Sequence, residues 1–365
     1  MKIGFDAKRA FNNKTGLGNY SRFVIEALEC YCSENQYITY TPKLNDSLFK
    51  HHKAIIPQHS FHSYWRSVGV VNDLKRDGIQ LFHGLSNELP IGLRKANIRS
   101  VVTIHDLIFI RYPDLYPAID RFFYYHKFKS ACQNADAVVA VSEQTKRDIV
   151  TFFGIDPQKI KVVYQDCDAA FRSRVGVEGI SKIKQKYGLD QPYILSVGTI
   201  EVRKNQLRLV QAFYEANLPE AMLVLVGGTT KYQRQIEQFI EQKNLKNKVK
   251  IFNKVPFIDL PALYQGAKLF AYTSVFEGFG IPIVEALHSQ VPVLAASGSC
   301  LEEAGGDGAI YSNPLIVSDI VQGLSVLWND IKLQKKLTTN GQRHVQQLAS
   351  SKIAQDLMAI YESIL

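Results

Sequence analysis

Two carboxylates bracket a glycine-containing turn in the second half of the chain. Glu277 and Glu285 flank residues 278–282, Gly-Phe-Gly-Ile-Pro, and the apolar run 269–272 precedes them. Such a run is typical of a buried parallel strand, and a proline suits the first turn of a helix. The first amides of that helix have no acceptor inside it and attract phosphate. The spacing predicts a site for a phosphorylated, polyhydroxylated ligand, and an ordinary strand-to-helix turn with two solvated glutamates is the alternative.

Two adjacent cations follow another predicted strand, residues 193–198. Arg203 and Lys204 lie in the loop after this strand and before an amphipathic helix. Cations beside the N-terminus of a helix suit a diphosphate group. The alternative interpretation is a solvated basic turn.

The first half of the chain has a glycine loop in a similar setting. Gly16 and Gly18 lie between a predicted strand, residues 3–6, and a helix that we expect to begin near Asn19. Glycine lets the backbone approach a ligand closely. Strand, glycine loop and helix again form a phosphate-binding arrangement, although two glycines are equally typical of a plain loop.

Polar residues also follow two further strands of the first half. His105 ends the strand 101–104, and Asp166 and Asp168 follow a strand that ends at Tyr164. Ligands of parallel α/β sheets bind at the carboxyl ends of the strands, so His105 is placed to meet a ligand, but a purely structural histidine is equally common. The two aspartates could hold the metal ion of a nucleotide diphosphate. A turn that uses both side chains is the favoured interpretation.

An aromatic stretch lies in an otherwise irregular segment, residues 41–75. Phe61, Tyr64, Trp65 and Val68 have the spacing of one helical face. We expect a helix packed on the core, in preference to an acceptor-binding or membrane-binding surface.

These residues must be positioned by two domains. The 365 residues alternate predicted strands and helices, and both residues 1–170 and residues 171–348 read as a doubly wound parallel α/β sheet. A basic, aromatic helix is expected near 117–133. A last amphipathic helix, within 349–365, must pack on one of the domains.

The amino-acid composition favours a soluble globular protein over membrane-spanning, secreted and nucleic-acid-binding classes. The chain is 46% hydrophobic and 21% charged, as in soluble globular proteins, and its five cysteines are scattered, which favours reduced thiols and the cytosol. The first residues read as a strand and not as a signal peptide, and no run is long enough to span a membrane. The formal net charge of +9 is spread over both halves. It argues against a basic nucleic-acid-binding arm and fits anionic small ligands or an anionic membrane surface.

The motifs together resemble one family over nearly the whole chain. Residues 276–282 with Glu285 match the Glu-x7-Glu signature of family 4 glycosyltransferases, which have the GT-B fold. Residues 197–205, Val-Gly-Thr-Ile-Glu-Val-Arg-Lys-Asn, resemble the family's diphosphate loop. Further stretches that resemble family segments, in family order, are 15–18, 104–106 and 301–307. The resemblance implies two Rossmann-like domains that face each other across a cleft, with the acceptor on the N-terminal domain and the nucleotide sugar on the C-terminal domain.

The resemblance also implies how the nucleotide is held. Lys204 would grip the diphosphate, with help from Arg203. The N–H groups of Gly280 and Ile281 would meet the phosphates, and Glu285 would bind the ribose hydroxyls. No metal ion and no other cofactor is implied.

Other residues would act on the sugar that is transferred. By the same resemblance, Glu277 would bind its hydroxyls and His105 would contact it across the cleft. Gly16 and Gly18 would let the first loop approach it. The last helix would cross back to the N-terminal domain.

The sequence departs from the family pattern at two positions. Many members have arginine where this chain has Thr199, and Arg203 would have to supply that charge. Members often have glycine where this chain has Asp166, and the sequence offers no reason for the change.

The resemblance implies a retaining hexosyltransferase of surface polysaccharide synthesis. Its donor would be GDP-mannose or a UDP-hexose, with mannose slightly favoured, and its acceptor a glycan or a lipid-linked sugar. The expected location is the cytoplasm, with peripheral attachment to the inner face of the membrane left open. The alternatives are a Rossmann-type nucleotide-dependent oxidoreductase and a non-catalytic nucleotide-sugar-binding protein.

Overall fold

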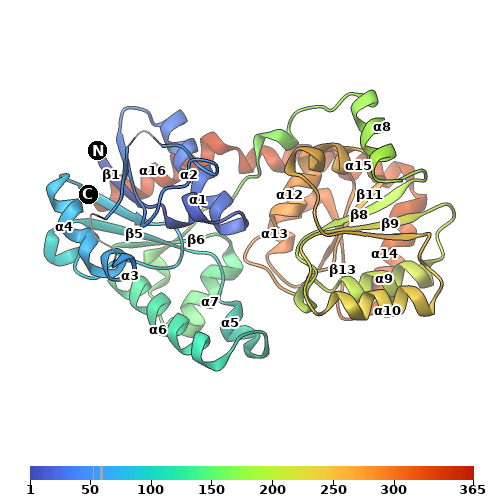
Figure 1. Cartoon of the computed structure of the whole chain (residues 1–365), viewed down its shortest axis with the longest axis horizontal. Helices are drawn as coiled ribbons and strands as arrows, with labels where there is room; N and C mark the ends of the chain where they lie inside the picture. Colours follow the sequence, from blue (N-terminus) through green and yellow to red (C-terminus); the bar gives the residue numbers. More distant parts are fainter. Residues whose placement is uncertain (52, 58–60) are drawn as a thin grey trace. The chain divides into compact units, whose positions relative to one another are not determined.

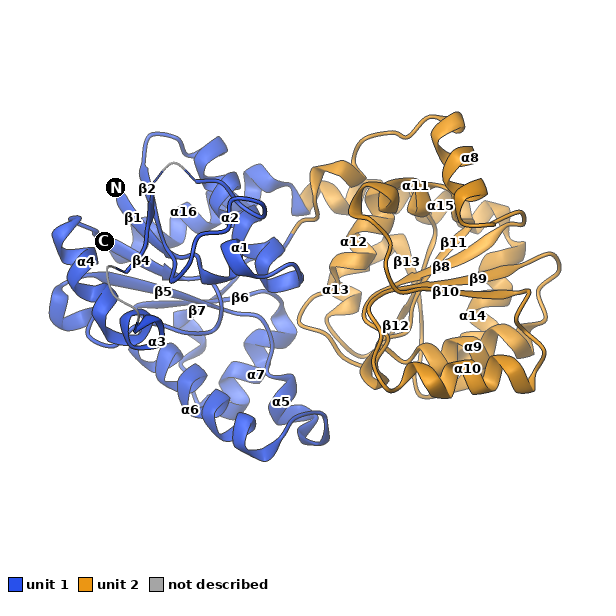
Figure 2. Ribbon diagram, viewed as in Figure 1, with its two compact units in different colours: residues 1–165, 348–365 blue, residues 166–347 orange. Residues whose placement is uncertain are grey.

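The computed structural model describes residues 1–51, 53–57 and 61–365. The chain forms two compact units, shown in blue and orange in Figure 2. Unit 1 comprises Met1–Gln165 and Leu348–Leu365, and unit 2 comprises Asp166–Gln347. The sequence placed the corresponding boundaries at 170 and 348. The chain therefore passes from one unit to the other twice.

Unit 1 is built on a seven-stranded sheet with the order β3-β2-β1-β4-β5-β6-β7. The strands are β1 Lys2–Asp6, β2 Gln36–Tyr40, β3 Ala54–Ile55, β4 Leu81–Gly84, β5 Arg99–Ile104, β6 Ala137–Ala140 and β7 Ile160–Val162. Neighbouring strands pair in parallel throughout the described residues. Parallel pairing requires crossover helices, which cover both faces of the sheet.

Helices α2 and α16 cover one face of this sheet, and α4, α6 and α7 cover the other (Figure 1). Tyr20 of α2 hydrogen-bonds Thr103 at 3.0 Å, and Tyr361 of α16 hydrogen-bonds His83 at 2.6 Å. The last helix thus packs on unit 1. The helices of unit 1 are α1 Lys8–Asn12, α2 Gly16–Tyr31, α3 His62–Tyr64, α4 Val70–Arg76, α5 Ile108–Arg111, α6 Ala118–Asn134, α7 Glu143–Phe153 and α16 Ser350–Ile364.

The helix predicted near residues 61–68 forms, as α3 and a π-helix, but of the four predicted residues only Trp65 packs on the core. Phe61, Tyr64 and Val68 are 74%, 63% and 37% exposed, and only Trp65 is buried, where it donates to Asp73 at 2.6 Å. For Val68 the reason is a π-helix, Trp65–Gly69, which joins α3 to α4. Its extra residue per turn shifts the helical phase, so that the face bearing Trp65 continues in α4. The inward side chains that follow are Val70, Val71 and Leu74. Residues 52 and 58–60 of the segment predicted to be irregular lie outside the described residues.

Unit 2 repeats the architecture with six strands in the order β10-β9-β8-β11-β12-β13. The strands are β8 Tyr193–Val197, β9 Met222–Val226, β10 Val249–Phe252, β11 Leu269–Tyr272, β12 Val293–Ala296 and β13 Ala309–Ser312. The helices are α8 Val177–Lys186, α9 Gln206–Ala216, α10 Gln233–Gln242, α11 Leu260–Gln265, α12 Ile281–His288, α13 Leu301–Gly305, α14 Val317–Asn329 and α15 Ile331–Val345. The predicted fold class, two doubly wound parallel α/β sheets, is confirmed.

The strand order of unit 2 locates its ligand-binding edge. β8 and β11 are neighbours, but the chain leaves β8 toward β9 and β10 and leaves β11 toward β12 and β13. Loops that diverge in this way open a crevice at the carboxyl ends of the two strands, which is where doubly wound sheets bind their ligands.

None of the helices in the described ranges is both long enough and apolar enough to cross a bilayer.

Candidate active site

The crevice of unit 2 is lined by the loops that follow β8 and β11. The Val275 amide donates to the Arg203 carbonyl at 2.8 Å, and the Asn205 side chain donates to the Thr273 carbonyl at 3.1 Å. Asn205 is buried and has a positive φ of 62°, a conformation that asparagine tolerates better than most residues. These contacts fix the backbone on either side of Lys204 against the loop of Glu277.

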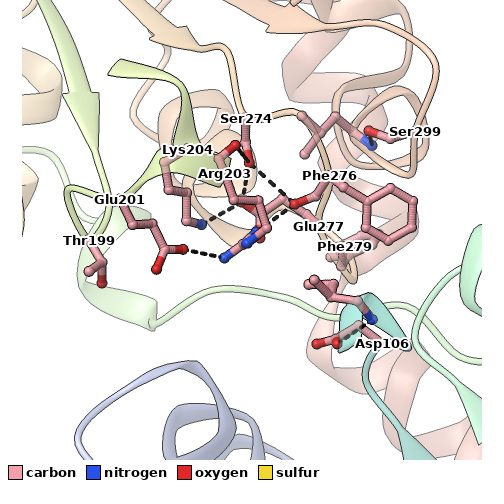
Figure 3. A network of polar contacts seen from close by, with 12 residues as sticks. Asp106, Thr199, Glu201, Arg203, Lys204, Ser274, Phe276, Glu277, Phe279 and Ser299 are labelled. Atoms are coloured by element: carbon pink, nitrogen blue, oxygen red, sulfur yellow. Dashed lines mark hydrogen bonds and ion pairs between the residues drawn. The ribbon is translucent and has the colours of Figure 1, made fainter. Parts of the chain in front are cut away.

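Four side chains converge on the Glu277 carboxylate, and Figure 3 shows three of them, Lys204, Arg203 and Ser274. Lys204 Nζ lies 2.5 Å from Oε1, and Arg203 Nη1 lies 2.7 Å from Oε2. Ser274 and Tyr272 donate their hydroxyls to Oε1 at 2.6 and 3.1 Å. The structure therefore brings together three residues that the sequence singled out, and it adds two hydroxyl donors that the sequence did not.

The charge of Glu277 is strongly stabilised. Burial opposes ionisation, but the attraction of Lys204 and Arg203 and their hydrogen bonds outweigh it and lower the pKa of Glu277 to about 2. The carboxylate is ionised at every physiological pH. In this arrangement it is a weak base and a weak nucleophile, because its lone pairs are held by donors.

A second carboxylate shares Arg203. Glu201 Oε1 accepts from Arg203 Nη2 at 2.6 Å. The two cations that the sequence assigned to a diphosphate are thus balanced by two carboxylates. Sequence reasoning missed this role of Glu201, although it stands only two residues from Arg203.

The start of α12 supplies the second part of the predicted phosphate site. Gly280 precedes the helix with a φ of 131°, a conformation that glycine alone adopts without strain. A Cβ at this position would also lie 2.8 Å from Leu301 Cδ2 of α13. Both constraints require glycine. The amides of Gly280 and Ile281 stand at the positive end of the helix dipole, where an anion is favoured.

Glu285 lies one turn further along α12 in a different environment. Its Oε2 accepts from the Tyr264 hydroxyl at 2.6 Å. Burial and the nearby negative charge of Asp168 raise its pKa to about 7, against the stabilising hydrogen bond of Tyr264. The two glutamates of the signature therefore differ in charge state near neutral pH. Tyr264 comes from α11, and no motif of the sequence marks it as a partner of Glu285.

The Asp166–Asp168 stretch forms a turn, as the favoured interpretation predicted. Asp168 accepts a backbone N–H two residues ahead at 2.8 Å. Asp166 pairs with Arg172 through one oxygen and with His288 through the other, the latter at 3.0 Å. Ligand-type atoms of Asp166, Cys167 and His288 lie within 4.8 Å of one another, but a cation there would have to compete with Arg172 for Asp166. Asp166 thus ties the segment after unit 1 to α12, which accounts for a carboxylate at a position where the family often has glycine.

In unit 1, His105 is buried at the carboxyl end of β5. Its Nε2 lies 2.9 Å from the Leu85 carbonyl, and its ring meets the edge of Tyr20 at 4.6 Å between centroids. Burial lowers its pKa to about 4. The imidazole is therefore neutral, and because a carbonyl can only accept, Nε2 carries the proton. Nδ1 is left as an acceptor with no partner among the described residues.

The predicted glycine loop is the first turn of α2. This helix begins at Gly16 and not near Asn19, which corrects the sequence prediction. A Cβ at Gly18 would lie 1.9 Å from the Asn13 carbonyl, so glycine is required there by the packing of its own loop. Nothing lies within 4 Å of a Cβ at Gly16, so the protein itself places no steric demand for glycine at that position.

Comparison with known proteins identifies the family. Residues 35–169 match the family described as Glycosyltransferase Family 4, and residues 177–344 match the one described as Glycosyl transferases group 1. The O-antigen chain mannosyltransferase B of Escherichia coli is 30% identical over 267 residues, which cover 70% of this chain and 68% of that protein. The chain belongs to glycosyltransferase family 4.

Two further comparisons agree with the assignment of this chain to glycosyltransferase family 4 and to its fold. The O-antigen chain mannosyltransferase RfbU of Salmonella typhimurium is 29% identical over 69% of this chain and 65% of that protein. The solved structure of Anabaena Alr3699/HepE in complex with UDP-glucose shares the fold over the full length of both chains, with a TM-score of 0.81 and 20% identity. The family and the GT-B fold class that the motifs predicted are confirmed.

The raised pKa of Glu285 predicts how stability changes with pH. The folded protein holds this proton up to about pH 7, whereas the unfolded chain releases it near 4.5. The contribution of the Glu285 proton to the unfolding free energy is fully present below pH 4.5 and is lost as the pH rises through 7. Between pH 5 and pH 8 the wild type should lose roughly 2–3 kcal/mol of unfolding free energy relative to Glu285→Gln.

Urea unfolding of both proteins at pH 5 and pH 8 measures this difference. Glu277→Gln is the control. Because the pKa of Glu277 is lowered from 4.5 to about 2, its protonation changes the unfolding free energy only below about pH 4.5, so the gap between wild type and this variant should be the same at pH 5 and pH 8. A gap between wild type and Glu285→Gln that does not change with pH would contradict the protonated state of Glu285.

Proposed function

We propose that this family 4 glycosyltransferase transfers a mannosyl group, with retention, from a nucleotide diphosphate sugar to a glycan or lipid-linked sugar acceptor in surface polysaccharide synthesis. The observation that carries the proposal is the 30% identity, over 70% of the chain, to an O-antigen chain mannosyltransferase. A GDP-mannose donor fits these relatives. The fold neighbour solved with UDP-glucose keeps a UDP-hexose as the second candidate.

Donor binding would rearrange the ion pairs of the site. The donor's diphosphate, at the start of α12, competes with Glu277 for Lys204 Nζ. As Lys204 moves to the phosphates, one Glu277 oxygen is released to accept hydroxyls of the transferred sugar. Glu285 then accepts from the ribose hydroxyls. Arg203, which also bonds Glu201 and the Phe276 carbonyl, stays in place and keeps the loop closed.

The chemistry follows from where charge develops. As the glycosidic bond to the diphosphate breaks, negative charge grows on phosphate oxygens, and Lys204 and the amides of Gly280 and Ile281 stabilise it. The low pKa of Glu277 argues against its acting as a covalent nucleophile or as a general base. We favour a front-side substitution in which the leaving phosphate takes the proton of the acceptor hydroxyl.

His105 would serve the sugar and not the nucleotide. A neutral imidazole with a free Nδ1 can accept a hydrogen bond from a sugar hydroxyl, and its pKa near 4 prevents it from becoming cationic. Gly16 lies in the same unit as His105. Because nothing lies within 4 Å of a Cβ built at Gly16, this position would leave room for the ligand.

Family membership favours a transferase over both alternatives raised by the sequence, an oxidoreductase and a non-catalytic binding protein. A lipid-linked acceptor would lie in a membrane, so we also propose a cytoplasmic protein that associates peripherally with the inner membrane face. The net charge of +9 supports attraction to an anionic surface.

A panel of nucleotide sugars tests the donor. GDP-mannose at a hundredfold excess over its Kd should stabilise the protein by about 2.7 kcal/mol, seen as a rise in the thermal unfolding temperature. Glu285→Ala should lose most of this rise, because it removes the proposed ribose contact. A larger rise with UDP-hexoses would replace the proposed donor, and no rise with any nucleotide sugar would contradict the function.

Single substitutions should separate catalysis from nucleotide binding. Lys204→Ala should lower kcat by roughly 10²-fold, the scale of one lost preorganised charge contact, with a smaller effect on donor affinity. Lys254→Ala, an exposed lysine of the same unit, is the control. His105→Ala should impair transfer while calorimetry finds nucleoside diphosphate affinity unchanged. If His105→Ala transferred sugar at the wild-type rate, or lost nucleotide binding while still folded, the proposed separation of sugar contacts from nucleotide contacts would be refuted.

Transfer should not need a divalent metal ion, because Lys204 and the start of α12 neutralise the diphosphate. The rate with excess EDTA should equal the rate without it, within about twofold. Complete loss of transfer in EDTA with recovery on adding Mn²⁺ would overturn this proposal. Asp166 and Asp168 would then become the first candidates for metal ligands, to be tested by substitution to asparagine.

A further inference from the structure

A row of buried polar side chains lies next to His105 in unit 1. His83 of β4 and Thr103 of β5 are fully buried, and His83 Nε2 lies 2.8 Å from Thr103 Oγ1. The two helices that cover this face add a tyrosine each. The Tyr361 hydroxyl of α16 lies 2.6 Å from His83 Nδ1, and the Tyr20 hydroxyl of α2 lies 3.0 Å from Thr103 Oγ1. These residues form one hydrogen-bonded series, which we name the buried polar chain.

The fold could fill the space of the buried polar chain with apolar side chains. Burial lowers the pKa of His83 to about 3, so its imidazole is neutral and has one donor and one acceptor nitrogen. The Tyr361 hydroxyl on one side and the Thr103 hydroxyl on the other satisfy both nitrogens. Apolar side chains of similar volume would pack here without needing any such partners. A fully paired polar network in this position therefore indicates a role beyond packing.

His105 stands one step further along the same two strands. Leu85 and His105 are the first residues after β4 and β5. Side chains two residues apart share one face of a sheet, which places His105 on the face of Thr103. Its Nε2 bonds the Leu85 carbonyl at 2.9 Å. The bond between His83 and Thr103 thus ties the two strands together just before the bond between Leu85 and His105.

Tyr20 links the buried polar chain to the imidazole of His105 directly. The ring of Tyr20 stands at 89° to that of His105, with 4.6 Å between the centroids. Because the Tyr20 hydroxyl is held by Thr103, the ring cannot turn away from this contact. An imidazole that is bonded through Nε2 and packed against a fixed ring has one orientation. Its Nδ1 therefore keeps the direction in which it would meet the sugar.

We propose that Tyr361 and Tyr20 are positioning residues of the transfer reaction, which hold the His105 imidazole in place through the buried polar chain. The inference rests on the proposed contact between His105 and the transferred sugar. Loss of the Tyr361 hydroxyl leaves His83 Nδ1 buried and unpaired, so this imidazole turns toward another partner and its bond to Thr103 weakens. His105 then loses the fixed ring of Tyr20 beside it. Nucleotide binding, which depends on unit 2, is unaffected.

Removal of single hydroxyl groups tests the proposal in the full-length protein. Tyr361→Phe should lower kcat by about tenfold, less than the roughly 10²-fold that a 1 Å misplacement can cost, with nucleoside diphosphate affinity unchanged in calorimetry. Tyr20→Phe should act in the same way.

The matched control is Tyr37→Phe. Tyr37 is a buried tyrosine of the same unit whose hydroxyl donates to the Cys32 carbonyl at 2.7 Å, outside the buried polar chain. Its variant also loses one buried hydrogen bond, so it should lose a similar amount of stability. Its kcat should stay within about twofold of the wild-type value.

Two further readouts separate positioning from a general structural role. Because Tyr361 acts through His105, Tyr361→Phe should not lower further the residual rate of His105→Ala. Nitrogen NMR of protein labelled at histidine needs no transfer, and the spectrum of His105→Ala identifies the His105 signals. They should show the proton on Nε2 in the wild type. Tyr361→Phe should shift or broaden them, whereas Tyr37→Phe should not.

Three outcomes would overturn the proposal. Equal falls in kcat for Tyr361→Phe and Tyr37→Phe would reduce the buried polar chain to a contribution to stability. A fall in kcat that persists in the His105→Ala background would show that Tyr361 acts elsewhere. Unchanged His105 signals in Tyr361→Phe would break the link directly. A wild type that transfers no sugar from any donor would count against the proposed function alone, and the NMR comparison would still decide whether Tyr361 positions His105.

Discussion

The site of unit 2 depends on the attraction between one buried carboxylate and two cations. Glu277 holds Lys204 at 2.5 Å and Arg203 at 2.7 Å, across loops that leave neighbouring strands in opposite directions. This attraction offsets the cost of burying three charges and keeps both loops in register. The proposed diphosphate would replace one partner of the network without leaving a buried charge unpaired, because it brings its own negative charge.

The sheets supply the rigidity behind this arrangement. Strands β8 and β11 are buried on both faces, so their ends are fixed by the core, and the reactive side chains begin one or a few residues later. Asn205 and Gly280 take backbone conformations that few residues accept, which lets each loop turn sharply into its helix. The positions of the site's side chains are therefore well defined because they lie on short loops that are anchored to buried strands.

Much of this could be predicted from the sequence. Apolar runs of four or five residues reveal parallel strands, and Glu277, Lys204 and His105 stand close behind such runs. The partner of Glu285 could not be predicted, because Tyr264 comes from α11 and meets α12 only in the fold. Glu201 and Tyr272 lie close in sequence to Arg203 and Glu277, but no pattern marks them as their partners. The exposure of Val68 could not be predicted either, since a π-helix changes the helical phase without a clear signal in the sequence. The contacts of Asp166 with Arg172 and His288, which account for its carboxylate, likewise have no signal in the sequence.

The return of the last helix to unit 1 has a consequence for biosynthesis. Helix α16 buries Leu357 and Tyr361 against a unit whose other residues end at Gln165. During translation, the sheet of unit 1 emerges before unit 2 but lacks this cover until α16 has been synthesised. Unit 2, whose residues are contiguous, can complete its core while still attached to the ribosome. Unit 1 is thus completed after unit 2, and until α16 emerges its exposed apolar face is a natural substrate for chaperones.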